Sequence, residues 1–222
     1  MASFDEQLQN LLGHHKPEEI EELVLDEFTK EIKFFSLVHK KGLELYRNLI
    51  HLSLNNIGLE NLSNFPEIKS LMILSLNNNK LTGDDFSIIP NTYPLLYKLK
   101  ISNNNIQSID KLSYFSKTKL KKIEIKDNPF TKNIENYRQK VYELIPSLVI
   151  VDQKQKNGQE IDTTDYGNDS SSMGDEDYED GDDAEVEDSD DSDVNEDESD
   201  NYEDEYNEEN EDDEKNKKKK KK

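Results

Sequence analysis

Apolar residues recur along the first 150 positions in one local pattern. An aliphatic residue stands at positions 1, 4 and 6 of the pattern, an Asn at position 9 and a further apolar residue at position 11. Copies begin at Ile20, Leu49, Leu71, Leu96 and Leu120. The last three copies are complete, the second has Ile57 at the Asn position, and the first is degenerate. Alternation of apolar and polar residues around positions 4 and 6 predicts a short strand with one buried face in each copy.

The starts of successive copies are 29, 22, 25 and 24 residues apart, which is the spacing of leucine-rich repeats. One copy cannot bury its own apolar face, so the copies are expected to stack. The Asn of each copy is expected to satisfy backbone groups that would otherwise be orphaned inside the stack. The pattern therefore predicts an α/β leucine-rich repeat solenoid with a curved parallel sheet on its concave side.

Both ends of the stack need a cap. Capping-box spacing at Ser3–Glu6, followed by Leu8, Leu11 and Leu12, predicts an amphipathic N-terminal helix. At the other end, a C-terminal cap is expected over about 135–152. It comprises a helix that presents Tyr137, Val141, Leu144 and Ile145 on one face and stops at Pro146, and then an extended segment over 148–152. Folded order is expected to fade between Asp152 and Asp162.

Charge divides the chain sharply. The 222 residues carry a formal charge of −22. Residues 1–161 hold 21 acidic and 21 basic residues, whereas residues 162–214 hold 29 Asp or Glu and neither Lys nor Arg. Seven Lys lie in 215–222. The expected organisation is therefore a repeat domain with caps over 1–161, a disordered acidic tail over 162–214 and a poly-Lys terminus over 215–222, because the tail has too few apolar residues to form a core.

Candidate catalytic chemistry is sparse. The chain has no Cys, and it contains no Gly-rich phosphate loop, nucleophile elbow or pair of His at i and i+4. Its first residues do not resemble a secretory signal, and no apolar run approaches the length of a membrane span. We therefore expect no enzyme activity, no cofactor, no metal site and no membrane contact.

The polar positions of the predicted strands form a candidate partner-binding face. The residues flanking the strand leucines should point to the concave side, and their charge changes from acidic through neutral to basic along the stack. The polar residues of this face are Glu22, Asp26, His51, Ser53, Asn55, Ser75, Asn77, Lys98, Lys100, Lys122, Glu124 and Lys126. Two interpretations remain open: solvated strand positions, or a docking surface whose two ends prefer opposite charges.

The acidic tail is the second candidate binding region. Its carboxylates imitate the charge density of a nucleic acid backbone, which predicts attraction to core histones or other strongly basic proteins, no direct binding to nucleic acids, and steep weakening by salt. The densest acidic runs are Asp175, Glu176, Asp177, Asp190, Asp191, Asp193, Glu196, Asp197, Glu198, Glu211, Asp212, Asp213 and Glu214. The alternative is a tail that only keeps the protein soluble.

Two further features of the last residues suggest regulation. Acid-directed kinases favour serines among acids, so the candidate phosphorylation sites are Ser172, Ser189, Ser192 and Ser199. The terminal basic run consists of Lys215, Lys217, Lys218, Lys219, Lys220, Lys221 and Lys222. This run is either a nuclear-import signal, a segment that folds back electrostatically on the acidic tail, or a consequence of the Lys-rich composition.

Several motifs together resemble the acidic leucine-rich nuclear phosphoprotein 32 family. They are Glu-Leu-Val-Leu-Asp at 22–26, the four repeats that follow, Asn-Tyr-Arg at 136–138 with Leu-Ile-Pro at 144–146, and the acidic tail with its basic end. The resemblance implies histone binding, chaperone-like regulation of chromatin, inhibition of a type 2A protein phosphatase, and a nuclear location with shuttling to the cytoplasm. The long interval between Phe28 and Leu49 and the pure poly-Lys terminus depart from the family pattern. An adaptor role is a further alternative.

Overall fold

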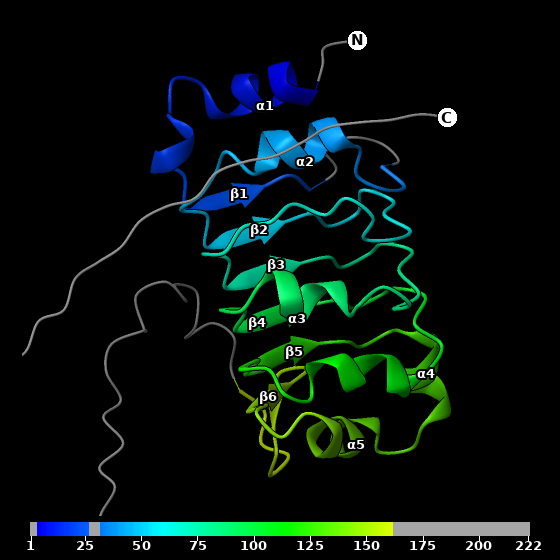
Figure 1. The fold of residues 1–222 in the computed structure, drawn as a ribbon. Coiled ribbons are helices and arrows are strands. Elements are labelled where there is room, and N and C mark those ends of the chain that lie inside the picture. Colours follow the sequence, from blue (N-terminus) through cyan, green and yellow to red (C-terminus); the bar gives the residue numbers. More distant parts are fainter. Residues whose placement is uncertain (1–3, 27–31, 162–222) are drawn as a thin grey trace, which may run out of the picture. The chain divides into compact units, whose positions relative to one another are not determined.

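The computed structural model describes residues 4–26 and 32–161 (Figure 1). The predicted acidic tail, its candidate phosphorylation sites, the poly-Lys terminus, Ser3 and Phe28 lie outside the described residues. The helical elements are α1 (Phe4–Leu12), η1 (Pro17–Glu19), α2 (Leu37–Leu43), α3 (Ile88–Thr92), η2 (Ile109–Phe115), α4 (Pro129–Asn133) and α5 (Tyr137–Leu144). The strands are β1 (Glu22–Val24), β2 (His51–Ser53), β3 (Ile73–Ser75), β4 (Lys98–Lys100), β5 (Lys122–Glu124), β6 (Ile150–Val151) and β7 (Lys154–Gln155).

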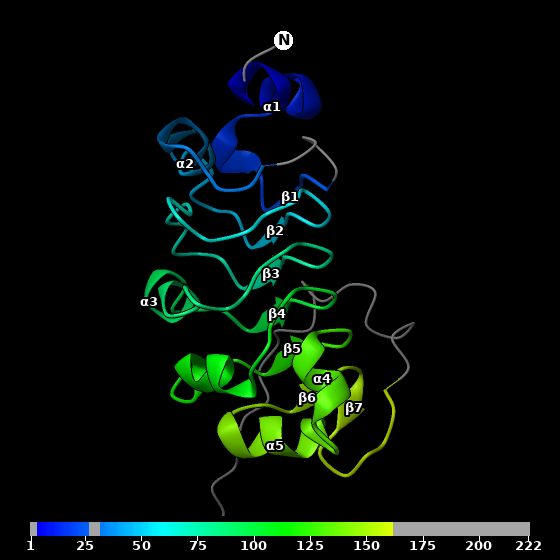
Figure 2. The ribbon, with the colours of Figure 1, turned by 90° about the vertical axis from the view of Figure 1, so that its right-hand side faces the viewer.

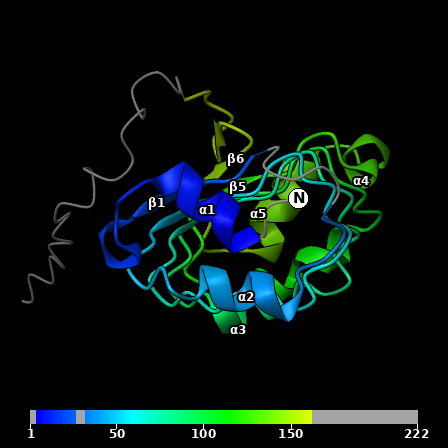
Figure 3. The same ribbon diagram turned by 90° about the horizontal axis from the view of Figure 1, so that it is seen from above.

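The strands form one sheet in sequence order, and β1 to β6 run parallel. Each of the five repeats contributes one strand, with its central residue aligned on the centre of the next strand. Figures 2 and 3 show α2 and α3 on the side of the stack away from the strands. The fold is therefore the predicted leucine-rich repeat solenoid, with the parallel sheet on the concave side and short helices or turns on the convex side.

The core is a column of aliphatic side chains between the sheet and the convex segments. Leu52, Leu74, Leu99 and Ile123, the central residues of β2 to β5, are all fully buried. Apart from the aliphatic column, aromatic rings fill the wider spaces: Phe35 packs edge-on against Phe65 with ring centroids 5.2 Å apart. Phe35 lies in the long interval between the first two repeats. This interval therefore contributes a buried side chain to the core.

The repeat Asn residues have the role predicted for them. The Asn79 Oδ1 accepts hydrogen bonds from the backbone N–H groups of Ile57 and Leu59, at 3.2 and 3.0 Å. Its Nδ2 donates to the carbonyls of Leu54 and Leu76 at 2.9 and 3.0 Å. Asn104 and Asn128 make corresponding contacts one and two repeats later. Each Asn therefore ties two successive repeats together through backbone groups that are shielded from water.

The two caps differ in how closely they follow the sequence pattern. Helices α1 and α5 form at the predicted positions, and α5 ends at Leu144 before Pro146. Leu8 is buried, but Leu11 is 51% exposed, so α1 covers the stack with a narrower apolar face than predicted. Regular structure continues beyond the predicted extended segment: β7 pairs antiparallel with β6, and the Ile161 N–H donates to the Gln153 carbonyl at 2.9 Å.

Candidate functional site

The concave face consists of three rows of side chains that cross the strands. The sheet register places Glu22, His51, Ile73, Lys98, Lys122 and Ile150 side by side in the first row. The second row contains Val24, Ser53, Ser75, Lys100 and Glu124. The third row lies just beyond the strands and contains Asp26, Asn55, Asn77, Ser102 and Lys126. All the residues predicted for this face therefore lie together on it, as an ordered array.

The acidic end of the array is held by hydrogen bonds within the protein. The Ser53 hydroxyl and the Asn55 N–H both donate to one Asp26 oxygen, at 2.7 and 2.8 Å. The other Asp26 oxygen accepts from the Asn55 amide at 2.9 Å. Nδ1 of His51 lies 2.8 Å from a Glu22 carboxylate oxygen. These carboxylates thus help to join the first two repeats. A partner that binds at this end would contact carboxylates that already have hydrogen-bond partners within the protein.

The third row continues as a ladder along the sheet. Oδ1 of Asn55 accepts a hydrogen bond from the Asn77 N–H at 2.7 Å, and Oδ1 of Asn77 accepts one from the Ser102 N–H at 2.8 Å. Each side chain therefore satisfies the backbone of the next repeat after its strand has ended. The central concave face carries no charged side chains. Its polar groups are pre-organised because they hydrogen-bond to one another.

The lysines of the basic end also have contacts within the protein. Lys100 Nζ lies 3.6 Å from Glu124, and the ammonium of Lys122 lies 5.2 Å from the centre of the Tyr97 ring. Lys126 is exposed immediately after β5. The four lysines of this end, two from β4 and two from the fifth repeat, outnumber its single acidic residue, Glu124. This end should attract anionic groups.

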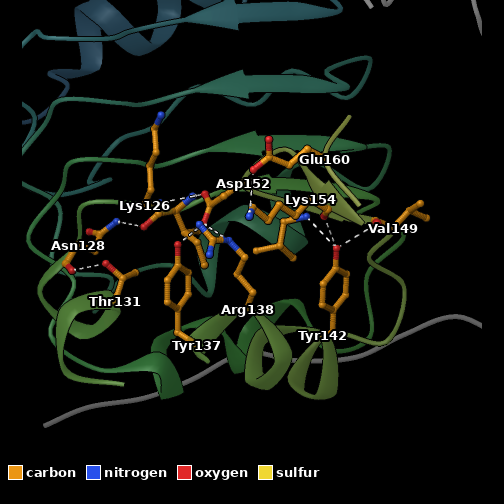
Figure 4. A network of polar contacts seen from close by, with 12 residues as sticks. Lys126, Asn128, Thr131, Tyr137, Arg138, Tyr142, Val149, Asp152, Lys154 and Glu160 are labelled. Atoms are coloured by element: carbon orange, nitrogen blue, oxygen red, sulfur yellow. Dashed lines mark hydrogen bonds and ion pairs between the residues drawn. The ribbon is translucent and has the colours of Figure 1, made fainter. Parts of the chain in front are cut away.

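The C-terminal edge of the array is fixed by Asp152 (Figure 4). One carboxylate oxygen accepts from the N–H groups of Ile125 and Lys126, at 2.7 and 3.0 Å. The other accepts from the Tyr137 hydroxyl at 2.7 Å and lies 3.7 Å from Nε of Arg138. This buried carboxylate takes over, for the last repeat, the backbone-capping role that the third row has elsewhere. Sequence analysis did not identify it as a structural counterpart of that row.

The phenol of Tyr137 should make the stability of the folded protein depend on pH. Burial, with a smaller contribution from the hydrogen bond to Asp152, raises the pKa of Tyr137 well above its usual value. Above pH of about 10 the unfolded chain loses phenol protons that the folded protein retains, so stability should fall as the pH rises further. We expect Tyr137→Phe to flatten this fall in urea-unfolding midpoints between pH 9 and 11. Equal slopes for the variant and the parent protein would contradict the assignment.

Within residues 4–26 and 32–161, no cluster of three or more His, Cys, Asp or Glu could hold a metal ion. In the same part of the chain, no helix has both the length and the apolar character needed to span a membrane.

Sequence reasoning missed three residues that shape the basic end. Ile150 continues the first row beyond the fifth repeat, Tyr97 lies beneath Lys122, and Ile161 returns to the concave face after β7. The position of Ile150 could have been predicted from the extended segment 148–152. A strand that pairs with the last repeat adds one residue to each row that it extends. The position of Ile161 could not be predicted in this way, because the turn before it lacks an apolar alternation.

Comparison with known proteins agrees with this architecture. A family profile described as "Leucine-rich repeat" matches residues 43–173. An acidic leucine-rich nuclear phosphoprotein 32-related protein of Plasmodium falciparum is 30% identical over 155 residues, covering 69% of this chain and 54% of the relative. The related protein 1 of Caenorhabditis elegans is 34% identical over 137 residues, covering 59% of each chain.

Other matches are more partial. Histone H2A.Y of Tetrahymena thermophila is 35% identical over 120 residues, covering 54% of this chain and 30% of that protein. Among solved structures, the Drosophila melanogaster SNF/U2A′ complex contains a chain with a TM-score of 0.46 and 22% identity, covering 66% of this chain and 76% of that one. The chain thus spans no more than 59% of the length of these curated relatives.

The resemblance to the acidic leucine-rich nuclear phosphoprotein 32 family is confirmed by relatives of that name in Plasmodium, rice, Arabidopsis and Caenorhabditis. The profile match covers more than half of the chain and includes four of the five predicted strands of the repeats. With the repeats, the stacked parallel strands and these relatives taken together, the chain belongs to the leucine-rich repeat family.

Proposed function

We propose that this protein is a nuclear histone-binding factor with chaperone-like activity on chromatin. The observation that carries the proposal is the separation of charge along the chain: a repeat domain of net charge zero is followed by 29 acidic residues without a single Lys or Arg. Polyanions of this density attract strongly basic proteins. The family relationship supports the assignment, since the relatives are named nuclear phosphoproteins and a further relative is named a histone.

The proposed mechanism assigns different tasks to the two regions. Carboxylates of residues 162–214 shield basic histone surfaces that would otherwise bind DNA nonspecifically. The repeat domain presents its concave array to a partner and selects among the proteins that the charge attracts. Binding of this type needs no covalent step, so we propose a binding protein and not an enzyme.

A nuclear location follows from the same proposal. The relatives are named nuclear phosphoproteins, and the seven Lys of residues 215–222 have the composition of an import signal. We also propose shuttling to the cytoplasm and phosphorylation at Ser172, Ser189, Ser192 or Ser199. If a chain that ends at Glu214 enters the nucleus as efficiently as the full chain, the import role of the Lys run is wrong.

The histone proposal is tested by changing the tail charge at constant length. In one full-length variant every Asp and Glu of residues 162–214 becomes Asn or Gln, and a second variant ends at residue 161. We expect both to bind core histones at least tenfold more weakly than the full chain in low salt, and the difference should shrink as salt is raised. Fluorescence anisotropy titrations at two salt concentrations measure this, and equal affinities in low salt would refute a mechanism based on the tail.

Phosphatase regulation and an adaptor role are the alternatives. Both would use the concave face, so they should survive neutralisation of the tail and be lost on charge reversal at Lys98 or Lys122. Inhibition assays with a type 2A protein phosphatase, using the same tail variants, distinguish phosphatase regulation from the function based on the tail. Retained inhibition together with retained histone binding would favour the phosphatase or adaptor alternative over the tail-based function.

A further inference from the structure

The concave face contains a small apolar socket at its basic end. Its volume is about 50 Å³, and its lining includes Ile123, Ile150 and Ile161 together with Lys98, Lys122 and Glu124. Ile150 and Ile161 are half-buried, so part of each side chain is accessible from the concave side. A socket of this size has room for the end of one aliphatic side chain but not for a drug-sized ligand, which needs several hundred cubic ångströms.

The rim of the socket is positive. Lys98 and Lys122 are direct neighbours across β4 and β5 in the first row of the array. The acidic member of the lining, Glu124, lies 3.6 Å from Lys100, and this contact offsets its charge. The resulting surface combines an aliphatic floor with two neighbouring ammonium groups, and the exposed Lys126 adds a third positive charge nearby.

The order of side chains within the first row defines what would fit. Crossing the strands from β3 to β6, the row presents Ile73, Lys98, Lys122 and Ile150, so two cations lie between two half-buried aliphatic residues. Neighbouring strands are separated by about 4.8 Å. An extended peptide that crosses them presents every second side chain to the face, at intervals of about 7 Å. The flexible Lys98 and Lys122 side chains can span this difference, so a peptide with acidic residues next to an aliphatic residue would suit the row.

We propose that Lys98, Lys122 and the socket beside Ile150 form a docking site for an extended acidic peptide of a partner protein, in which one aliphatic residue is flanked by carboxylates. The ammonium groups bind the carboxylates, and the aliphatic side chain enters the socket. This site goes beyond histone binding by the tail, because it recognises a partner of the opposite charge. It would stand even if the tail failed to bind histones.

The test uses the full chain and a fluorescein-labelled ten-residue peptide of Asp and Glu with one central Val. We expect Lys98→Glu and Lys122→Glu each to weaken peptide binding at least tenfold in low salt. The matched control is Lys140→Glu, which makes the same charge change at an exposed position of α5 outside the socket. This control should change the affinity less than twofold.

Two further measurements separate the socket from general electrostatic attraction. Replacing the central Val of the peptide by Asn should weaken binding several-fold, and backbone amide shifts on peptide addition should concentrate in β4 to β6. Urea midpoints of all variants verify that they are folded. Equal weakening by Lys122→Glu and Lys140→Glu, indifference to the Val, or lack of measurable binding by the parent protein would each overturn the proposal.

Discussion

Replacing Asn104 with Ala is expected to lower the free energy of unfolding by about 2–4 kcal/mol, because it leaves the buried Leu81 N–H without its acceptor and removes one of the two donors to each of two buried carbonyls. Oδ1 of Asn104 accepts from the Leu81 N–H at 3.0 Å. Its Nδ2 donates to the carbonyls of Leu76 and Ile101, at 2.9 and 3.1 Å. A buried group without a hydrogen-bond partner costs about 1–3 kcal/mol, and an alanine methyl group replaces none of these contacts.

The adjacent residue supplies the control. Asn105 is exposed, and its side chain accepts a hydrogen bond from the Gln107 amide at the surface. Asn105→Ala should therefore change the free energy of unfolding by no more than about 0.5 kcal/mol. Urea titrations followed by circular dichroism compare the two variants with the parent protein. Similar midpoints for Asn104→Ala and Asn105→Ala would show that the buried carboxamide does not hold the repeats together.

The repeats were predictable because each one forms the same short strand with one buried face. Alternation around Leu74 and Leu76 predicts a strand with one buried face, and the same alternation at Leu99 and Ile101 places the next strand in register with it. Once stacking is required, Asn79 has few possible roles, since a carboxamide can both donate to and accept from the backbone at an interior turn. Periodicity therefore determines the sheet, its register and its concave rows.

Other features depend on contacts that periodicity does not encode. Nothing in the alternation of residues 153–161 indicates that β7 turns back and carries Ile161 to the concave face. Charge counting correctly groups Asp26 with the acidic end of the face, but it does not reveal that both oxygens of this carboxylate bind Ser53 and Asn55. The composition of the site was thus predictable, whereas the division between structural and accessible charges required the three-dimensional arrangement.

The second large effect is expected at Asp152, whose side chain is 2% exposed. Asp152→Ala would leave the N–H groups of Ile125 and Lys126 and the Tyr137 hydroxyl without their acceptor, and it would remove the carboxylate facing Arg138. Loss of one member of a buried ionic network costs about 3–5 kcal/mol. The backbone adds to this cost, because Asp152 has a φ of 49°, which Asp and Asn tolerate better than Ala. The urea midpoint should fall accordingly.

Asp152→Asn distinguishes the hydrogen bonds from the charge. Its amide oxygen can still accept from Ile125 and Lys126, and Asn also suits the positive φ, so we expect about half of the loss caused by Ala. Lys156→Ala, at an exposed position immediately after β7, is the surface control. Because Asp152 lies in the turn between β6 and β7, Asp152→Ala should also accelerate amide exchange at Ile161 and weaken binding of the acidic peptide, whereas Asp152→Asn should largely preserve both. If Asp152→Ala shifted the midpoint no more than Lys156→Ala, Asp152 would not be the group that closes the repeat stack and holds the socket in place.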